Sequence, residues 1–293
     1  AVSHHVAGSH HGVHMTSNQY LQGSQPYRPA QFNEEHSVSS SDEGVFAGWG
    51  SKEGSPDEYY GDRPINEAPA YVRRDFIRKV YSLLTFQLVL TVAIAAPFNL
   101  FLTPTWVRQH MALYYLAVFG SLGIILGMGC CCPQAAQTFP TNYIFLLIVT
   151  VCEAVIVGFL TAFYTTQSVL LAVATTVVVF AGLTCYACFT KTDFTGLGPY
   201  LMGALLGLMG FGLVVSIFSM FSTIPTWLHL LYSFIGVIIF CFYIIYDTQL
   251  IVGGRHKKHQ FSIDDYVFAS LNLYLDIINL FIYILSLMGE RRN

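Results

Sequence analysis

The sequence predicts an all-α membrane protein: a bundle of seven transmembrane helices with a central C-terminal helix, preceded by a disordered N-terminal tail. The chain is 54% hydrophobic and only 11% charged, whereas a soluble domain carries about 25% charged residues. From residue 71 onward, the apolar residues form seven runs, each close to the length of about 20 residues that crosses a bilayer. The runs are continuous rather than alternating, which excludes a membrane strand barrel.

The first seventy residues differ from the rest of the chain in composition. They are rich in Ser, Gly, Pro, His, Gln and acids, with nine acidic against three basic residues, a net charge of −6. Such a segment cannot bury enough apolar surface to offset the entropy lost on ordering. We therefore expect a disordered acidic cytoplasmic tail over 1–70 and a seven-helix membrane domain over 71–293. The tail holds no apolar run suited to a secretory signal, so we expect the first span to direct insertion.

The membrane domain opens with a basic amphipathic lead-in over residues 71–79. The seven spans are expected near 80–102, 112–132, 142–163, 168–189, 197–221, 228–252 and 266–288. Prolines are expected at or near the ends of these spans, where a broken helix is tolerated. These prolines are Pro97, Pro104, Pro133, Pro140, Pro199 and Pro225.

The orientation of the bundle follows from the basic residues beside the spans, because cytoplasmic loops carry an excess of Lys and Arg. A cytoplasmic N-terminus places eight of them inside: Arg73, Arg74, Arg78, Lys79, Lys191, Arg255, Lys257 and Lys258. Three then lie outside: Arg108, Arg291 and Arg292. A re-entrant last run would move Arg291 and Arg292 inside, but residues 266–288 are long enough to cross, so seven spans are preferred.

Seven cysteines all lie in or beside apolar runs, which is unlike a secreted disulfide framework. Three of them, Cys130, Cys131 and Cys132, fall at the predicted cytoplasmic end of the second span. Juxtamembrane cysteines are candidate palmitoylation sites, and plain interfacial cysteines are an equal alternative.

Only three acidic residues fall within the spans: Glu153, Asp247 and Asp276. An isolated charge at the bilayer centre costs roughly 2.5–3.5 kcal/mol, so such residues are functional candidates. At 1.5 Å rise per residue, Asp276 lies about 15 Å and Asp247 about 8 Å from the cytoplasmic ends of their helices. Because these two helices are antiparallel and joined by a short loop, we expect Asp247 and Asp276 to meet.

Helical spacing in the last span predicts an inward-facing polar stripe. Its members step by three or four residues: Asp265, Ala269, Asn272, Asp276, Asn279, Tyr283 and Ser286. The other faces carry Leu, Ile and Phe, which places this helix at the centre of the bundle. For Asn272 and Asn279, a role in the polar pathway and a role as hydrogen-bonding glue between helices are equally open.

Two carboxyl groups brought together in a low dielectric cannot both ionise easily, so the pair is expected to share a proton. Protonated, it forms a neutral clasp. Deprotonated, the groups repel and leave an anionic site that could take up Ca²⁺ transiently, because this ion prefers oxygen ligands. Asp247 and Asp276 are thus predicted as a pH sensor and gate. Glu153 either adds a carboxylate to the same pathway or hydrogen-bonds a neighbouring helix while protonated.

Enzyme and nucleic-acid functions find little support in these residues. The Tyr246-Asp247 pair matches the first motif of intramembrane aspartyl proteases, but the glycines of the second motif are missing before Asp276. A zinc hydrolase would need several intramembrane histidines, and only His229 falls within a predicted span. No basic patch suited to nucleic acid is present. We therefore expect neither an enzyme nor a bound cofactor.

Three strings of residues are distinctive: FIRKVYSLLTFQL at 76–88, YDTQLIVGG at 246–254 and DDYVFASLNLYLDIINLFIYIL at 264–285. Together they resemble the transmembrane Bax inhibitor motif family, Lifeguard branch. The likeness covers about residues 71–293. It implies a last helix enclosed by six others and a protein that opposes apoptosis and leaks Ca²⁺ from stores. The paired aspartates proposed as the family's pH sensor map onto Asp247 and Asp276.

The resemblance also implies a location and partners. The endoplasmic reticulum or Golgi is expected first, with the plasma membrane or endolysosome as alternatives. The partners expected are calcium ions and the lipid bilayer. The alternative function is a non-conducting adaptor that suppresses death-receptor or Bcl-2-family signalling by binding proteins. Bacterial relatives are thought to latch the pore with charged residues in the second helix, and residues 112–132 contain none.

Overall fold

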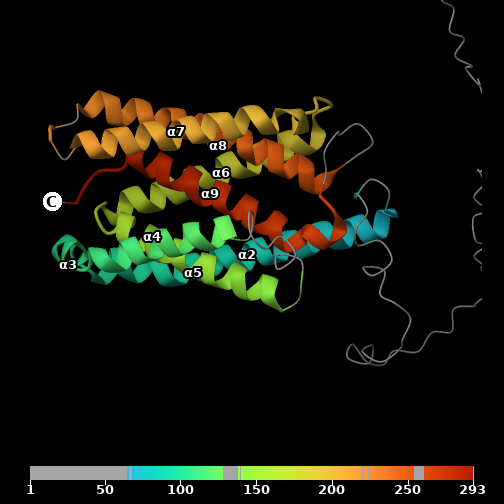
Figure 1. The fold of residues 1–293 in the computed structure, drawn as a ribbon, viewed down its shortest axis with the longest axis horizontal. Helices are drawn as coiled ribbons and strands as arrows, with labels where there is room; N and C mark the ends of the chain where they lie inside the picture. The colour runs from blue at the N-terminus through green and yellow to red at the C-terminus, as the bar shows by residue number, and fades with distance from the viewer. Residues whose placement is uncertain are drawn as a thin grey trace, which may run out of the picture. The chain divides into compact units, whose positions relative to one another are not determined.

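The structure, a computed structural model, is a bundle of long helices (Figure 1). It describes residue 65 and the ranges 68–127, 140–219, 221–223, 225–253 and 261–292, together with Thr138. The predicted tail over 1–70 lies almost wholly outside these residues, as do Cys130, Cys131 and Cys132. An isolated antiparallel β-bridge joins Tyr164 to Arg291.

The helices follow the predicted order of spans. They are α2 (Ala70–Phe101), α3 (Pro104–Gln109), α4 (Met111–Leu126), α5 (Thr141–Thr161), α6 (Thr166–Phe189), α7 (Gly198–Ser219), α8 (Thr226–Val252) and α9 (Tyr266–Met288). Short 3₁₀ turns, η4 (Thr195–Leu197) and η5 (Ile263–Asp265), precede α7 and α9. Among the described residues, six helices are long and apolar enough to span a membrane, and α4 is a shorter apolar helix. The predicted seven-helix bundle is confirmed.

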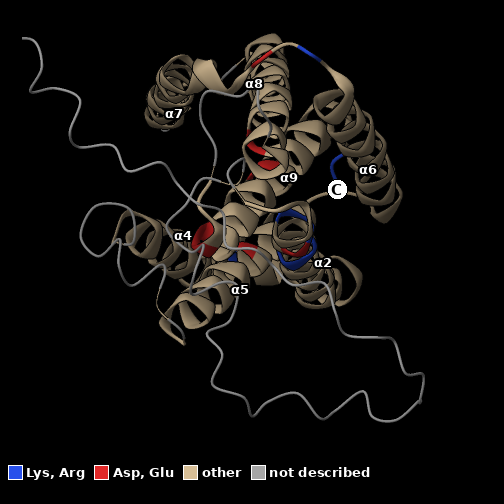
Figure 2. Ribbon diagram, turned by 90° about the vertical axis from the view of Figure 1, so that its right-hand side faces the viewer, with Lys and Arg blue, Asp and Glu red and all other residues tan. Residues whose placement is uncertain are grey.

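Helix α9 lies at the centre of the bundle, as predicted. It packs against α2, α5, α6 and α8, while α4 packs on α5 and α7 packs on α8. Figure 2 shows α9 with α2, α4 and α5 on one side and α6, α7 and α8 on the other. In its most apolar stretch, 56% of the residues of α9 are buried, against 11% in α6 and in α7. Four helices therefore make the main enclosure, and α4 and α7 form an outer layer.

Two boundaries differ from the prediction at the first span. Helix α2 begins at Ala70, ten residues before the predicted start, because no helix breaker separates the basic lead-in from the apolar run. Pro97 lies inside α2 rather than at its end, four residues before the last. Pro104 instead opens the unpredicted α3, where the Thr103 side chain accepts from the Trp106 amide at 3.3 Å. Proline is favoured there because the first turn leaves its N–H groups unpaired in any case.

Segments beside the two ends of α9 are bonded to residues at or near opposite ends of the first helix. Near its start, the Ile65 amide donates to the Phe261 carbonyl at 3.3 Å. Beyond its end, the Arg292 guanidinium donates to the Asn99 carbonyl at 3.2 Å, and the Arg292 amide donates to the Phe163 carbonyl at 2.8 Å. The last helix therefore runs along the length of the first helix.

Candidate functional site

Two carboxyl groups meet where α8 and α9 pack together. Asp247 lies on α8 and Asp276 on α9, with only 4% and 5% of their surfaces exposed. Their side chains are hydrogen-bonded to each other. The prediction that the two acids meet, made from helix rise and an antiparallel arrangement, is confirmed.

The surroundings of the pair are aromatic and poor in positive charge. Tyr243, one turn before Asp247 on α8, interacts electrostatically with both carboxyl groups, and Tyr246 interacts with Asp247. Within the part of the chain that the structure describes, neither carboxyl has a Lys, Arg or His partner. The Oδ2 atom of Asp276 is buried without any hydrogen-bond partner. Because a bare buried carboxylate is costly, an arrangement of this kind favours a proton shared between the two groups.

A buried glutamine fixes α8 beside the pair. Gln249 is 1% exposed and follows Asp247 by two residues. Its Oε1 accepts from the Phe194 amide at 2.8 Å, and its Nε2 donates to the Thr192 carbonyl at 3.0 Å. These bonds tie the end of α8 to the connection between α6 and α7. Sequence reasoning missed this residue, although a glutamine in an apolar run was the available signal.

The polar stripe predicted on α9 is not its most buried face. Asn272 and Asn279 are only half-buried, and Asn279 donates to the Leu275 carbonyl of its own helix at 2.8 Å. Leu273 and Leu280, on other faces, are fully buried. The stripe is buried at Ala269 and Asp276, and the central position of the helix buries apolar side chains on its other faces as well.

Asp265 lies at the start of α9, apart from the carboxyl pair. Its carboxylate accepts from the Ser262 amide at 3.1 Å, and the Asp265 amide in return donates to the Ser262 side-chain oxygen. This reciprocal arrangement is a capping box, which stabilises the entry to a helix. The structure therefore gives Asp265 a capping role, whereas the sequence grouped it with the pathway.

Glu153 lies on α5 and points to the outer helix α4. The Ser121 hydroxyl donates to Glu153 Oε1, joining the two helices. Of the two alternatives left open for this residue, the structure shows the hydrogen bond to a neighbouring helix. Glu153 also interacts electrostatically with Tyr274 on α9, which connects it to a second polar layer.

This second layer joins α2, α5 and α9 and was not predicted. The Tyr274 hydroxyl lies 2.8 Å from Thr91 Oγ1, and Gln87 Nε2 donates to Thr150 Oγ1 at 3.1 Å. All four side chains are buried, and Gln87 Oε1 has no hydrogen-bond partner. Because Tyr274 and Asp276 are two residues apart, they project from nearly opposite faces of α9. The central helix thus carries one polar contact toward α8 and another toward α2.

The pair alone is too small to hold a resident calcium ion. Among the described residues, no group of three or more His, Cys, Asp or Glu side chains could hold a metal. Ca²⁺ takes six to eight oxygen ligands. Two carboxyl groups are therefore suited at most to a cation in transit, which would keep much of its own water.

Comparison with known proteins identifies the family. The family model described as inhibitor of apoptosis-promoting Bax1 matches residues 73–293, which includes both aspartates and every described helix except the first turn of α2. The chain belongs to this family.

Members of the Bax inhibitor family from distant organisms resemble the chain over most of its length. Protein lifeguard 3 of Homo sapiens is 39% identical over 224 residues, covering 75% of this chain and 70% of the relative. Protein LIFEGUARD 3 of Arabidopsis thaliana is 37% identical, covering 74% and 85%. Bax inhibitor 1 of Schizosaccharomyces pombe is 33% identical, covering 81% and 84%. The resemblance to the Lifeguard branch is confirmed, and the chain is a multi-pass membrane protein of an anti-apoptotic family.

Proposed function

We propose that the protein is a pH-sensitive calcium leak of intracellular membranes that lowers the calcium load of a store and thereby opposes apoptosis. The observation that carries the proposal is the buried carboxyl pair between α8 and the central helix α9. A purely structural contact would be served at lower cost by two amides or two leucines, because buried charges are expensive. Such a pair is best explained by a need to change protonation.

The gate works through the proton that the two aspartates share. While the proton is present, Asp247 and Asp276 form a clasp that holds α8 against α9. When it leaves, two negative charges face each other in a low dielectric and repel. The two helices part at this point, and the site becomes anionic. The leak therefore rises as pH rises, and it falls as the pair regains its proton.

The same deprotonated site attracts the cation that passes. Asp276 Oδ2, which lacks a partner in the closed arrangement, supplies one oxygen, and Asp247 supplies another. A weak site of this kind favours conduction, because an ion that binds too tightly does not leave. Gating and attraction thus reside in the same two residues.

The location of the leak follows the orientation predicted from Lys and Arg. The N-terminus and the start of α9 face the cytoplasm, so the carboxyl pair responds to cytoplasmic pH. The endoplasmic reticulum or Golgi is the membrane proposed, with the plasma membrane or endolysosome as alternatives. The relatives named Bax inhibitor 1 and lifeguard support the anti-apoptotic part of the proposal.

The test is calcium flux from proteoliposomes that contain the purified full chain, measured over a range of pH. Asp247→Asn and Asp276→Asn are measured alongside, because an amide keeps the shape and the hydrogen bond but cannot ionise. The proposal expects flux that rises with pH in the natural protein and loses that dependence in both variants. Flux no greater than that of empty liposomes at every pH, with folded protein, contradicts it.

A second candidate is a non-conducting adaptor that binds Bcl-2-family or death-receptor proteins. The description of the matched family, which names the apoptosis-promoting Bax as its target, favours this reading. Deletion of residues 1–70 separates the two candidates. A leak keeps its flux without the tail, whereas an adaptor that works through the tail loses protection of cells from apoptosis.

A further inference from the structure

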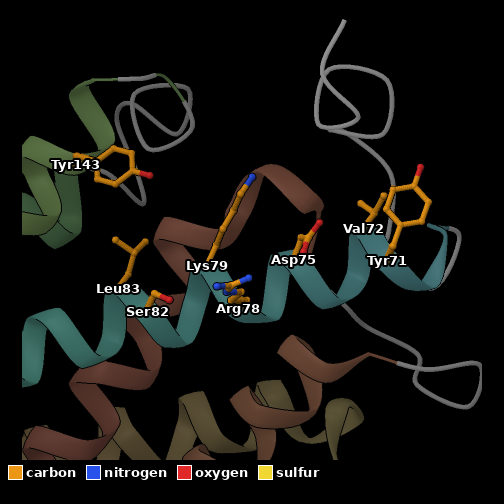
Figure 3. A pocket seen from close by; sticks show the side chains of 8 residues that line it. All are labelled: Tyr71, Val72, Asp75, Arg78, Lys79, Ser82, Leu83 and Tyr143. Carbon is orange, nitrogen blue, oxygen red and sulfur yellow. The ribbon is translucent and has the colours of Figure 1, made fainter. Parts of the chain in front are cut away.

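We propose that a cavity on the predicted cytoplasmic side of α2 binds the headgroup of an anionic phospholipid. The cavity has a volume of about 490 Å³ and is separate from the carboxyl pair. Seven of its lining residues come from the first turns of α2, and Tyr143 comes from the start of α5 (Figure 3). The proposal is independent of the calcium leak.

The chemistry of the lining fits a phosphate group. Arg78 and Lys79 supply two positive charges, and Ser82 and Tyr143 supply hydroxyl groups. Asp75 is the single acid among the lining residues that the structure describes, so these residues together carry a net positive charge. Arginine can bind two phosphate oxygens at once, and lysine adds a point charge. The Ser82 hydroxyl adds a hydrogen-bond donor to these two charges.

The position of the cavity along α2 indicates the membrane surface. Lys79 is the last charged residue of α2, and no other follows until Arg108. Tyrosines gather at the same level: Lys79 Nζ lies 5.3 Å from the centre of the Tyr266 ring, and the Tyr143 hydroxyl donates to that of Tyr266 at 3.3 Å. Tyrosine and lysine at helix ends are typical of the interface between headgroups and hydrocarbon.

The exposed apolar surface that follows the cavity along α2 favours a lipid over a free phosphate as the ligand. Phe86, Val89 and Val92 continue the helix toward the membrane core, and they are 55%, 63% and 60% exposed. Phe86 and Val89 lie on the same face as Arg78 and Ser82, because these residues step by three or four. A headgroup bound at Arg78 can therefore run its acyl chains down an exposed apolar face. A free phosphate or a soluble peptide would use only the upper part of this surface.

The predicted orientation also favours an anionic lipid as the ligand. The cytoplasmic leaflet carries the anionic lipids, and basic pockets beside transmembrane helices on that side bind their headgroups. Arg73 and Arg74 lie next to the cavity in sequence but do not line it. They add positive potential around it and provide a matched control for a charge that lies outside the site.

The test is binding of phosphatidic acid with a fluorescent acyl chain to the purified full chain in detergent, followed by anisotropy. Unlabelled phosphatidic acid, phosphatidylcholine and inorganic phosphate serve as competitors. We expect only phosphatidic acid to compete strongly. Competition by inorganic phosphate at comparable concentration overturns the assignment to a lipid, and equal competition by phosphatidylcholine overturns the assignment to an anionic lipid.

Three variants locate the binding. Arg78→Gln is expected to weaken binding about fivefold, the usual effect of one basic residue near an anionic headgroup. Arg74→Gln removes the same charge outside the cavity and should weaken binding much less. Asp75→Asn removes the opposing acid and should strengthen binding.

Arg74, Asp75 and Arg78 are all exposed, so the three substitutions should leave the fold intact, which is checked by size-exclusion chromatography and circular dichroism. An equal loss in Arg78→Gln and Arg74→Gln, or no gain in Asp75→Asn, contradicts a site in the cavity.

Discussion

The ring of Tyr283 on α9 lies directly against Gly236 on α8. A Cβ atom built at residue 236 would come within 2.5 Å of Tyr283 Cδ1. This close approach lies eleven residues before Asp247 on α8, or about 16 Å along the helix. The two helices that carry the aspartates are thus packed tightly at one level and joined by carboxyl groups at another, and only the second contact is proposed to depend on pH.

Replacing Gly236 by alanine should loosen this packing. The added methyl group forces the Tyr283 ring to move, and overpacking of this kind typically costs about 1–3 kcal/mol. Gly207→Ala on α7 is the control, because nothing lies within 4 Å of the position of its Cβ. Denaturant unfolding in detergent micelles measures both. The packing argument fails if Gly236→Ala is no less stable than Gly207→Ala.

Replacing Tyr274 by phenylalanine should weaken the junction of α9 with α2. The change removes the hydroxyl that lies 2.8 Å from Thr91 Oγ1 and leaves the ring in place. Hydrogen bonds between membrane helices are worth roughly 0.6 kcal/mol on average and up to about 1.7 kcal/mol. A double-mutant cycle with Thr91→Val isolates this bond. Additive losses in the double variant would show that the two hydroxyl groups are not coupled.

The separation of α8 and α9 near the carboxyl pair should depend on pH. As pH rises, the pair loses its shared proton and the charges repel, so the distance between the two helices increases. Nitroxide labels on the last turn of α8 and the first turn of α9 report this distance by pulsed electron paramagnetic resonance. The double variant Asp247→Asn with Asp276→Asn should keep the short distance at every pH. A pH response that persists in this variant assigns the switch to other groups.

Two kinds of feature could be predicted from the sequence: apolar runs of the length of a span, and acidic residues that are energetically costly within such a run. Apolar runs gave the helices, and two acids in such runs pointed to a buried site at Asp247 and Asp276. Their meeting could be predicted because both lie a known number of residues from one short connection. The length of α2 was missed, since charged residues in a lead-in extend a helix as readily as they end it.

The second polar layer could not be predicted in the same way. Thr91 and Tyr274 are 183 residues apart in sequence, and Gln87 and Thr150 are 63 apart. Uncharged polar side chains are common in membrane helices, so each alone carries little information. Only the packing of α9 among α2 and α5 shows which of them are partners. The partners of Gln249 could not be predicted either, because they lie in the connection between α6 and α7, which has no periodic sequence pattern.

The last prediction concerns the contact between Ser121 and Glu153. Ser121→Ala removes the donor and should lower stability by roughly 0.6 kcal/mol, the average for a hydrogen bond between membrane helices. Glu153→Gln keeps an acceptor oxygen for Ser121 and should cost less. If Glu153 only holds α4 against α5, Glu153→Gln leaves the pH dependence of calcium flux unchanged, in contrast to Asp276→Asn. A shifted pH dependence in Glu153→Gln would instead place this carboxyl in the pathway, connected to it by the electrostatic interaction with Tyr274 on the central helix.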